Sequence, residues 1–494
     1  MWSLRKVTVS FFVIALVCLG LSDIAIISAD PWSELSRMAM GFVLPAFFSW
    51  PELLKSVINT LAFALVGVAV AAVLGLALAR FFHWRIVRIF CAFIRSVHEL
   101  FWALFFLQIF GLQTLTGLLA IIIPFTGIFT KVYAEIIEEA DQKPLQSLPA
   151  RAMHSSSAYL YAKLAVAWPQ LVSYTRYRLE CGIRSSAILG FVGLPTLGFH
   201  LESYFKQGDY AEAAGVLYVF FLMIATLKFW SHRRSLLALL IVSFFALPFD
   251  VTLHTDNIQR FLTQDIIPSP LRYAETWWNI EVWQRTLEWS AWLFSHQIQE
   301  GVWNTLLLTM TALVGSGVVT MVLYPLVSPL FFGKGVRWPG HLLLVVMRSL
   351  PELLLAFVIV VMIGPSMLPA IIALSLHNGA IIAHLLGQST RTMILRQDAP
   401  KGMNLYFYEV TPRLYRPFLA FLFYRWEVIL RESAILGILG IHTLGFYVDS
   451  AFEELRFDRA FFLILICALL NMLVDAISRL IRSKLRLTAL PEMR

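Results

Sequence analysis

Residues 177–199 read YRLECGIRSSAILGFVGLPTLGF, and residues 424–446 read YRWEVILRESAILGILGIHTLGF. The two stretches are identical at 14 of 23 positions, and both place the charged pattern Arg-x-Glu-x-x-x-Arg before an apolar run punctuated by glycines. One chain therefore contains the same uncommon element twice. Self-similarity of this kind predicts a fold built from two related halves.

The composition indicates the class of protein. The chain has 494 residues, of which 59% are hydrophobic and 14% are charged, and its mean hydropathy is +0.74. A soluble globular protein has about 25% charged residues, so this composition predicts an all-α integral membrane protein in a lipid bilayer. The four cysteines lie far apart without a Cys-x-x-Cys spacing, which predicts neither a disulfide framework nor a metal site.

Apolar stretches along the chain predict about twelve membrane-spanning helices, because a span needs about 20 apolar residues. The first is the N-terminal segment, interpreted as an uncleaved helix that starts on the inside. The others are residues 56–79, 88–110, 114–137, 163–190, 212–230, 235–250, 302–327, 340–363, 366–387, 416–438 and 459–478.

The basic residues predict the orientation of these helices, because cytoplasmic loops carry an excess of Lys and Arg. With an N-terminus inside, the basic connections all fall on one side, and both termini are expected in the cytoplasm. Residues 251–300 contain six acids, three bases and five tryptophans, which predicts an external loop with an interfacial helix. The net charge of +8 is thus interpreted as a topology signal, and no nucleic-acid partner is expected. The predicted cytoplasmic residues are Arg80, Arg85, Arg88, Lys143, Arg151, Arg233, Arg234, Lys334, Arg337, Arg391, Arg396, Lys401, Arg479, Arg482, Lys484 and Arg486.

The repeat extends beyond the quoted stretches. Asn59-Thr60-Leu61 recurs as Asn304-Thr305-Leu306, and the pattern Arg-Ser-x-x-Glu-Leu at 95–100 recurs at 348–353. We therefore predict two halves of six helices each, residues 1–232 and 233–494. An even number of helices per half gives both halves the same orientation, so they form parallel repeats about a pseudo-twofold axis along the membrane normal.

Motifs of enzyme chemistry are absent from the sequence. There is no phosphate-binding GxxxxGK[ST] loop, no HExxH and no GxSxG. The eleven histidines are scattered rather than clustered as metal ligands, and His377 is interpreted as a loop or helix-end residue. The chain is therefore predicted not to be an enzyme and to hold no cofactor.

These motifs resemble those of the phosphonate ABC-importer permease family, and the resemblance covers the chain twice. The family pattern YR-x-E-x-x-x-R-S-A-x-x-LGFVG is closely matched in the first half, and R-x-x-PELVWAL resembles IRSVHELFWAL. The second half departs from it at Glu432, which stands where the family has Ser. The resemblance implies two fused permeases in a bacterial inner membrane, with a pair of ABC ATPase subunits and a periplasmic phosphonate-type binding protein as partners. The matching residues are Arg178, Glu180, Arg184, Ser185, Leu189, Gly190, Phe191, Val192 and Gly193.

The resemblance also implies a cytosolic coupling loop that docks on the ATPase. Alignment to the family's EAA-x3-G sequence places Gln146, Ser147 and Leu148 at EAA and Ala152 at the glycine. The second half has lost about half of this loop, and the residues that remain there are Asp398, Lys401 and Gly402.

Two interpretations of the charged residues within the predicted spans remain open. Charges inside a membrane are usually paired, but a surplus one marks a pathway. Each copy of the motif has two arginines around one glutamate, so Arg184 and Arg431 are predicted to face the translocation path for an anion. The other predicted pathway residues are Glu180, Glu427, Arg178, Arg425, Ser185, Ser186 and Ser433. The pairs Arg95–Glu99 and Arg348–Glu352, spaced four residues apart, are predicted to be intramembrane ion pairs.

Two functions are considered. The first is the permease subunit of an ABC importer that moves phosphonate-like oxyanions and is powered by a separate ATPase. The alternative is a secondary transporter or channel for small anions that works without an ATPase. Membrane acids suited to proton or sodium coupling would favour the alternative, but most of the acids within the predicted spans lie beside an arginine.

Overall fold

The computed structural model describes residues 4–27, 30–141, 143–149, 155–230, 233–248, 252 and 254–487. The described residues form helices and loops, and none of them forms a strand. The prediction of an all-α membrane protein is confirmed in this form. Contacts divide the chain into two compact units, Met38–Gln259 and Met1–Arg37 with Arg260–Arg494. The helices α2 (Pro31–Val43) and α14 (Thr255–Arg260) contain the two boundaries.

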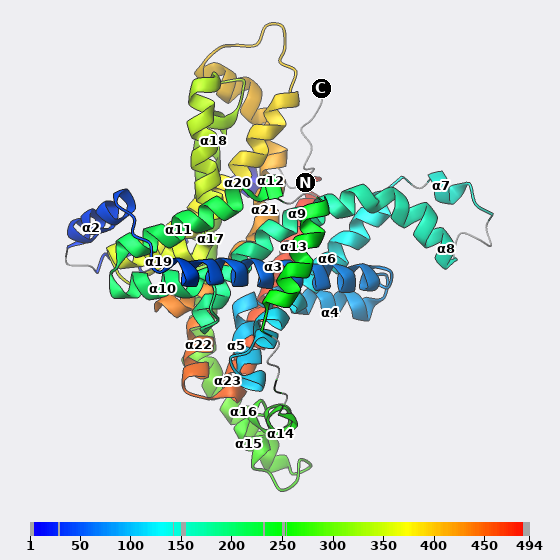
Figure 1. Ribbon diagram of the computed structural model, residues 1–494, viewed down its shortest axis with the longest axis vertical. Helices are drawn as coiled ribbons and strands as arrows, with labels where there is room; N and C mark the ends of the chain where they lie inside the picture. Colours follow the sequence, from blue (N-terminus) through cyan, green and yellow to red (C-terminus); the bar gives the residue numbers. More distant parts are fainter. Residues whose placement is uncertain are drawn as a thin grey trace. The chain divides into compact units, whose positions relative to one another are not determined.

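The unit Met38–Gln259 is built around α3, which packs against α6 and α9 (Figure 1). Gly67 and Gly75 of α3 lie against Ile121 and Phe129 of α6, so the two helices approach closely where a side chain is missing. The helices of this unit are α3 (Trp50–Ala79), α4 (Arg85–Ser96), α5 (Glu99–Phe110), α6 (Thr114–Glu139), α7 (Lys143–Gln146), α8 (Ser156–Ala158), α9 (Ala165–Ile188), α10 (Leu197–Gln207), α11 (Tyr210–Ala225), α12 (Leu227–Trp230) and α13 (Arg233–Ala246).

The second unit is built around α17, which packs against α20 and α21. Threonine hydroxyls of α17, such as those of Thr305 and Thr320, donate to carbonyl oxygens one turn earlier, so these buried polar groups are satisfied within the helix. The helices are α1 (Leu4–Leu21), α15 (Ser269–Arg272), α16 (Ile280–Leu293), α17 (Gln299–Val327), α18 (Lys334–Ser349), α19 (Glu352–Ile363), α20 (Met367–Ser389), α21 (Thr411–Ile435), α22 (Leu444–Glu453) and α23 (Phe457–Lys484).

The first helix of each predicted half packs with the other half. Helix α1 lies against α17, and α13 lies against α3. The segment that follows α1 is also bound to this second unit, since the Ile27 amide donates to the Ile363 carbonyl at 2.8 Å. The compact units therefore differ from the sequence halves 1–232 and 233–494. The unit Met38–Gln259 includes α13 from the second half, and the other unit includes α1 from the first half.

Two predicted spans are broken helices. Residues 88–110 were expected as one helix, but α4 and α5 meet at a bend of 91°. Residues 340–363 likewise form α18 and α19, with a bend of 93°. Apolar length alone does not reveal such a bend, and the prediction of one continuous span in each place is wrong.

The Trp-rich segment before α17 also differs from the prediction. Helix α16 continues through a π-helical turn, Phe294–Ile298, into α17, so residues 280–327 form one long helix of 48 residues. At 1.5 Å per residue it is about 70 Å long, which is more than twice the thickness of a hydrocarbon core of about 30 Å. The segment is thus continuous with α17 and is not a separate helix, and its position at the membrane surface stays a prediction.

Among the described residues, six helices are long and apolar enough to cross a membrane, or up to ten if each of four bent pairs is one span. Two shorter apolar helices, Tyr210–Ala225 and Ser235–Ala246, also occur. The chain is thus a multi-pass membrane protein.

Candidate functional site

The repeated motif folds as a helix, a tight turn and a second helix. In the first half α9 continues as a 3-10 turn, Leu189–Val192, and the chain then turns at Gly193, whose φ of +92° lies in the left-handed region that favours glycine. The second half repeats this at Gly440, with a φ of +79°. The glycines that punctuate the motif therefore shape a sharp turn.

Two further glycines allow the helix that follows the turn to touch the helix before it. A Cβ atom at Gly198 would overlap the carbonyl oxygen of Ala187, and one at Gly445 would overlap that of Ala434. These neighbours are backbone atoms, which cannot move aside as a flexible side chain can.

The repeated Asn-Thr-Leu motif holds this turn. The Thr60 hydroxyl accepts a hydrogen bond from the Leu197 amide at 2.9 Å, and the Asn59 side chain donates to the Pro195 carbonyl at 2.9 Å. In the second half the Leu444 amide donates to Thr305 at 3.0 Å and Asn304 donates to His442 at 2.8 Å. Residues far apart in sequence thus fix the end of the motif in the same way in each half.

We expect Gly445→Ala to destabilise the chain by about 3 kcal/mol or more, at the upper end of the usual cost of overpacking, because the new methyl group meets backbone. The control is Gly335→Ala, since a Cβ atom there meets nothing within 4 Å. Thermal unfolding of the purified variants in detergent measures both changes. An unchanged unfolding temperature for Gly445→Ala would contradict the close approach of α21 and α22.

The charged residues of the first motif copy lie on α9. Arg178, Glu180 and Arg184 are all half-buried. The Arg178 Nε donates to the hydroxyl of Tyr174 at 2.7 Å, and the guanidinium lies over that ring at 5.3 Å from its centroid. Arg184 donates to the sulfur of Cys181 at 3.4 Å. These arginines therefore contact soft and aromatic groups within the fold while keeping part of their surface exposed.

The second copy has the same exposure pattern on α21, with Arg425, Glu427 and Arg431 half-buried. Arg184 belongs to the unit Met38–Gln259 and Arg431 to the other unit. The expectation that the two guanidinium groups face each other across a pathway therefore stays a prediction.

The serines of the motif have local partners. Ser186 donates to the Ile183 carbonyl at 2.8 Å, and Ser433 donates to the Leu430 carbonyl at 2.8 Å. Ser185 donates instead to the Glu99 carboxylate of α5 at 3.4 Å.

The predicted ion pair assumed that Arg95 and Glu99, four residues apart, lie one above the other on a single helix. The structure places them on two different helices. Arg95 lies in the last turn of α4, whereas Glu99 is the first residue of α5, beyond the bend. His98 caps α5, since its Nδ1 accepts the Leu100 amide at 3.1 Å, and its Nε2 lies 3.2 Å from the Glu99 carboxylate. A histidine and Ser185 therefore contact this buried acid.

In the second half the same bend separates Arg348 from Glu352. Pro351 precedes α19, and Leu350 before it has the extended backbone that a following proline favours. Arg348 and Glu352 therefore do not share one helix face either, and the ion pairs Arg95–Glu99 and Arg348–Glu352 stay predictions.

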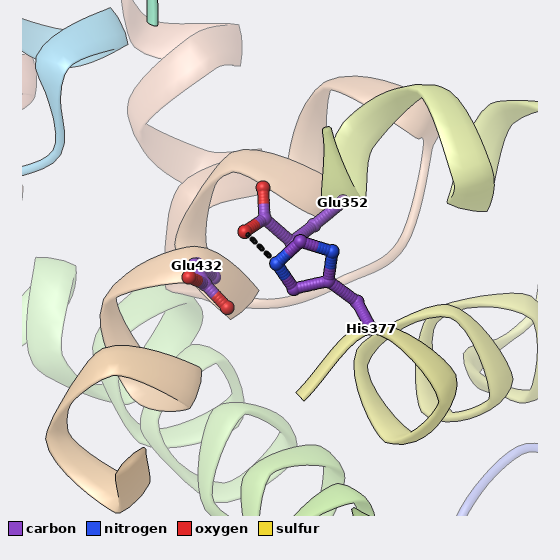
Figure 2. A group of neighbouring side chains, drawn as sticks. All are labelled: Glu352, His377 and Glu432. Atoms are coloured by element: carbon purple, nitrogen blue, oxygen red, sulfur yellow. Dashed lines mark ion pairs between the residues drawn. The ribbon is translucent and has the colours of Figure 1, made fainter. Parts of the chain in front are cut away.

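Glu352 contacts a histidine from a different element. The Nε2 of His377, in the middle of α20, lies 2.9 Å from the Glu352 carboxylate. Figure 2 shows these side chains converging with Glu432 of α21. Asn378 donates to Glu432 at 3.1 Å, and all four residues are buried.

His377 is the residue that the sequence interpretation missed, since it lies within α20 and is fully buried. The repeat offers a signal for it. Glu352 lies 253 residues after Glu99, and at the same distance His377 corresponds to Pro124 of the first half. The two motif copies lie 247 residues apart, and at that distance Glu432 corresponds to Ser185. Two titratable residues in the second half thus replace two that cannot ionise in the physiological range.

The predicted coupling loop of the first half follows α6. The four-residue helix α7 includes Gln146, and Ser147 and Leu148 follow it, with the Ser147 hydroxyl donating to the Pro144 carbonyl at 2.8 Å. Ala152 and Arg151 lie outside the described residues.

The corresponding segment of the second half, residues 393–402, is irregular and includes Asp398, Lys401 and Gly402. A buried carboxylate holds it in place. Glu409 lies 2.6 Å from Arg396 and 2.5 Å from Arg413. This network joins the segment to the start of α21.

Comparison with known proteins shows similarity to transport permeases. The chain is 24% identical over 459 residues to a phosphate-import permease protein of Mycolicibacterium smegmatis, covering 87% of this chain and 85% of that protein. It is 29% identical over 240 residues to a phosphite transport system permease protein of Stutzerimonas stutzeri, covering 46% of this chain and 86% of that protein. A putative cryptic phosphonate transport system permease protein of Escherichia coli is 27% identical over 116 residues, 24% of this chain and 95% of that protein. No family model and no solved structure matches the chain.

Proposed function

Since these relatives place the chain among the phosphonate-type transport permeases, we propose that it is the membrane-spanning subunit of an ABC importer for phosphorus oxyanions. The alignment with a phosphate-import permease, which covers most of both chains, is the observation that carries this proposal. The resemblance predicted from the motifs is confirmed at the level of the family.

The substrate class follows from the names of the relatives and from the arginines. The relatives are named for phosphate, phosphite and phosphonate, which are tetrahedral anions of phosphorus. An anion that enters the membrane must exchange its hydration shell for hydrogen-bond donors, and a guanidinium offers a planar fork that suits such oxygens. Half-buried Arg184 and Arg431, repeated in the two halves, supply these donors.

Two permease repeats are proposed to form one translocation unit, with residues 1–232 and 233–494 in parallel about a pseudo-twofold axis. The equivalent hydrogen bonds of Thr60 and Thr305 to the two motif copies support this proposal. So does the phosphite relative, which aligns along 86% of its length with 46% of this chain.

The energy source is proposed to be a pair of separate ABC ATPase subunits, because this chain has no phosphate-binding loop. The coupling surfaces would be the loop around α7 and residues 393–402, held by Glu409. A periplasmic binding protein would deliver the anion to the outer face.

The chain is proposed to lie in the bacterial inner membrane with both termini in the cytoplasm, as its basic residues predict. We expect a cysteine at Glu288, an exposed position of α16, to react with a membrane-impermeant thiol reagent in intact spheroplasts. The control is Lys401→Cys, also exposed, which should react only after permeabilisation. Both variants are made in a background that lacks the four native cysteines. The reverse labelling pattern would refute this topology.

Uptake by cells tests the function itself. Deletion of the gene should abolish uptake of at least one of labelled phosphate, phosphite and methylphosphonate, measured in a strain that lacks its other phosphate importers. Re-expression should restore it. Unchanged uptake of all three anions after deletion would reject a phosphorus oxyanion as substrate. Uptake that persists after depletion of cellular ATP, with an ion gradient maintained, would favour the ATPase-independent alternative.

A further inference from the structure

We propose that Glu352, His377 and Glu432 form a binding site for a divalent transition-metal ion, of which zinc is the best match. The cluster lies within one compact unit and joins the start of α19, the middle of α20 and the last turns of α21 (Figure 2). The proposal goes beyond transport, and neither depends on the other.

The geometry suits a small cation. One ligand atom from each of the three side chains lies within 4.8 Å of the others. Zinc bonds of about 2.1 Å in a tetrahedral arrangement place neighbouring ligand atoms about 3.4 Å apart. The separations of the ligand atoms therefore exceed this value by at most about 1.4 Å (4.8 Å less about 3.4 Å). A water molecule would complete the coordination, as in zinc sites with three protein ligands.

The charges of the cluster also favour a cation. Glu432 and Glu352 are 6% and 9% exposed, and His377 is fully buried. Two carboxylates enclosed together repel each other, and taking charged groups out of water is costly unless an opposite charge compensates them. Arg425 offsets part of the charge on Glu432, and a divalent ion bound between the two carboxylates would offset both directly.

The donor types select among metals. Calcium and magnesium prefer sites made of oxygen ligands, whereas an imidazole nitrogen together with carboxylates suits zinc and similar ions. Asn378 donates to the Glu432 carboxylate at 3.1 Å, which orients it as the hydrogen-bonding partners of metal ligands do. Metal ligands must be a neutral imidazole and charged carboxylates, so binding would release any proton that the cluster holds and place the ion between the side chains.

The first half serves as an internal comparison. It has a buried Glu99 with an adjacent His98, yet the positions of His377 and Glu432 are occupied by Pro124 and Ser185. The same helices thus pack in the first half without the two added ligands. Packing alone therefore does not require a histidine and a second buried carboxylate. The arrangement of these two added groups with Glu352 matches a metal ligand set.

Metal content of the purified full-length chain in detergent tests the proposal. After removal of bound metal with a chelator and titration with zinc, we expect about one tightly bound zinc ion per chain. Glu432→Ser, which introduces the residue of the first half, should reduce this to near zero, and so should His377→Gln. His98→Asn is the matched control and should bind as the unaltered chain does, because the described residues place no third metal ligand beside Glu99 and His98.

Two further readouts keep the test decisive if a variant folds poorly. Zinc should raise the thermal unfolding temperature of the unaltered chain, and cobalt in its place should give the visible absorption of a four-coordinate ion. Zinc binding that is equal in the unaltered chain and in a folded Glu432→Ser variant would overturn the proposal. Stabilisation of the unaltered chain by acid but not by zinc would also overturn it and would show that the cluster shares a proton instead.

Discussion

Replacing Arg184 by Gln is expected to lower uptake of the proposed phosphorus oxyanion by about 10- to 100-fold while the chain still inserts in the membrane. Hydrogen bonds to charged groups contribute about 1.5–3 kcal/mol, and each 1.4 kcal/mol corresponds to about tenfold in rate. Gln keeps hydrogen-bonding capacity and much of the side-chain length but removes the charge. The decrease in uptake therefore measures the contribution of the positive charge. Initial uptake rates, divided by the amount of chain in the membrane, measure the effect.

Arg431→Gln is expected to reduce uptake less than Arg184→Gln. The second half carries Glu432 directly after Arg431. When the cluster of Glu352, His377 and Glu432 holds no metal ion, this carboxylate offsets part of the positive charge of the neighbouring arginines. The anion therefore meets a weaker positive potential in this half, and removing one arginine there changes it less.

The double variant Glu180→Gln with Arg184→Gln separates a pathway role from a structural one. If the two residues only neutralise each other, single changes lower the amount of protein and the double change restores both amount and uptake. If Arg184 contacts the anion, the double variant is well expressed and still defective in uptake. Full uptake by a well-expressed double variant would contradict the pathway role.

The sequence predicts the parts of the fold that depend on local composition. Apolar length identifies the long helices α3, α6, α17, α20 and α23, because a span must satisfy its backbone hydrogen bonds internally and bury no unpaired charge. The repeated Asn-Thr and glycine motifs indicate positions of structural importance. The structural role of the repeated threonines is visible only in the fold, in which Thr60 and Thr305 accept hydrogen bonds from the turns of the two motif copies.

Features that depend on tertiary contacts could not be predicted in this way. The bends before Glu99 and Glu352 lie inside apolar stretches, so hydropathy does not detect them, although Pro351 gives a local signal in the second half. The packing of α1 on α17 is a contact between distant segments that no local pattern encodes. The cluster around His377 could not be predicted from its local sequence, because Glu352 and Glu432 come from two other helices.

The second large effect concerns the energy source. The purified chain alone should bind no ATP, since it has no phosphate-binding loop. In proteoliposomes it should transport nothing above background until the ATPase subunits are added. One copy of the chain should suffice per ATPase pair, because it is proposed to contain both permease repeats. Two copies of the chain per ATPase pair in native mass spectrometry would contradict this stoichiometry.

The most direct measurement is therefore uptake of labelled phosphite, phosphate or methylphosphonate by proteoliposomes that contain the chain together with the proposed ATPase and binding protein. With ATP on the side of the ATPase, we expect accumulation of at least one anion against its gradient. We also expect this accumulation to be lost when ATP is omitted or when the ATPase carries an inactivating change in its phosphate-binding loop. Accumulation that proceeds equally without ATP, or with the chain alone, would contradict this expectation.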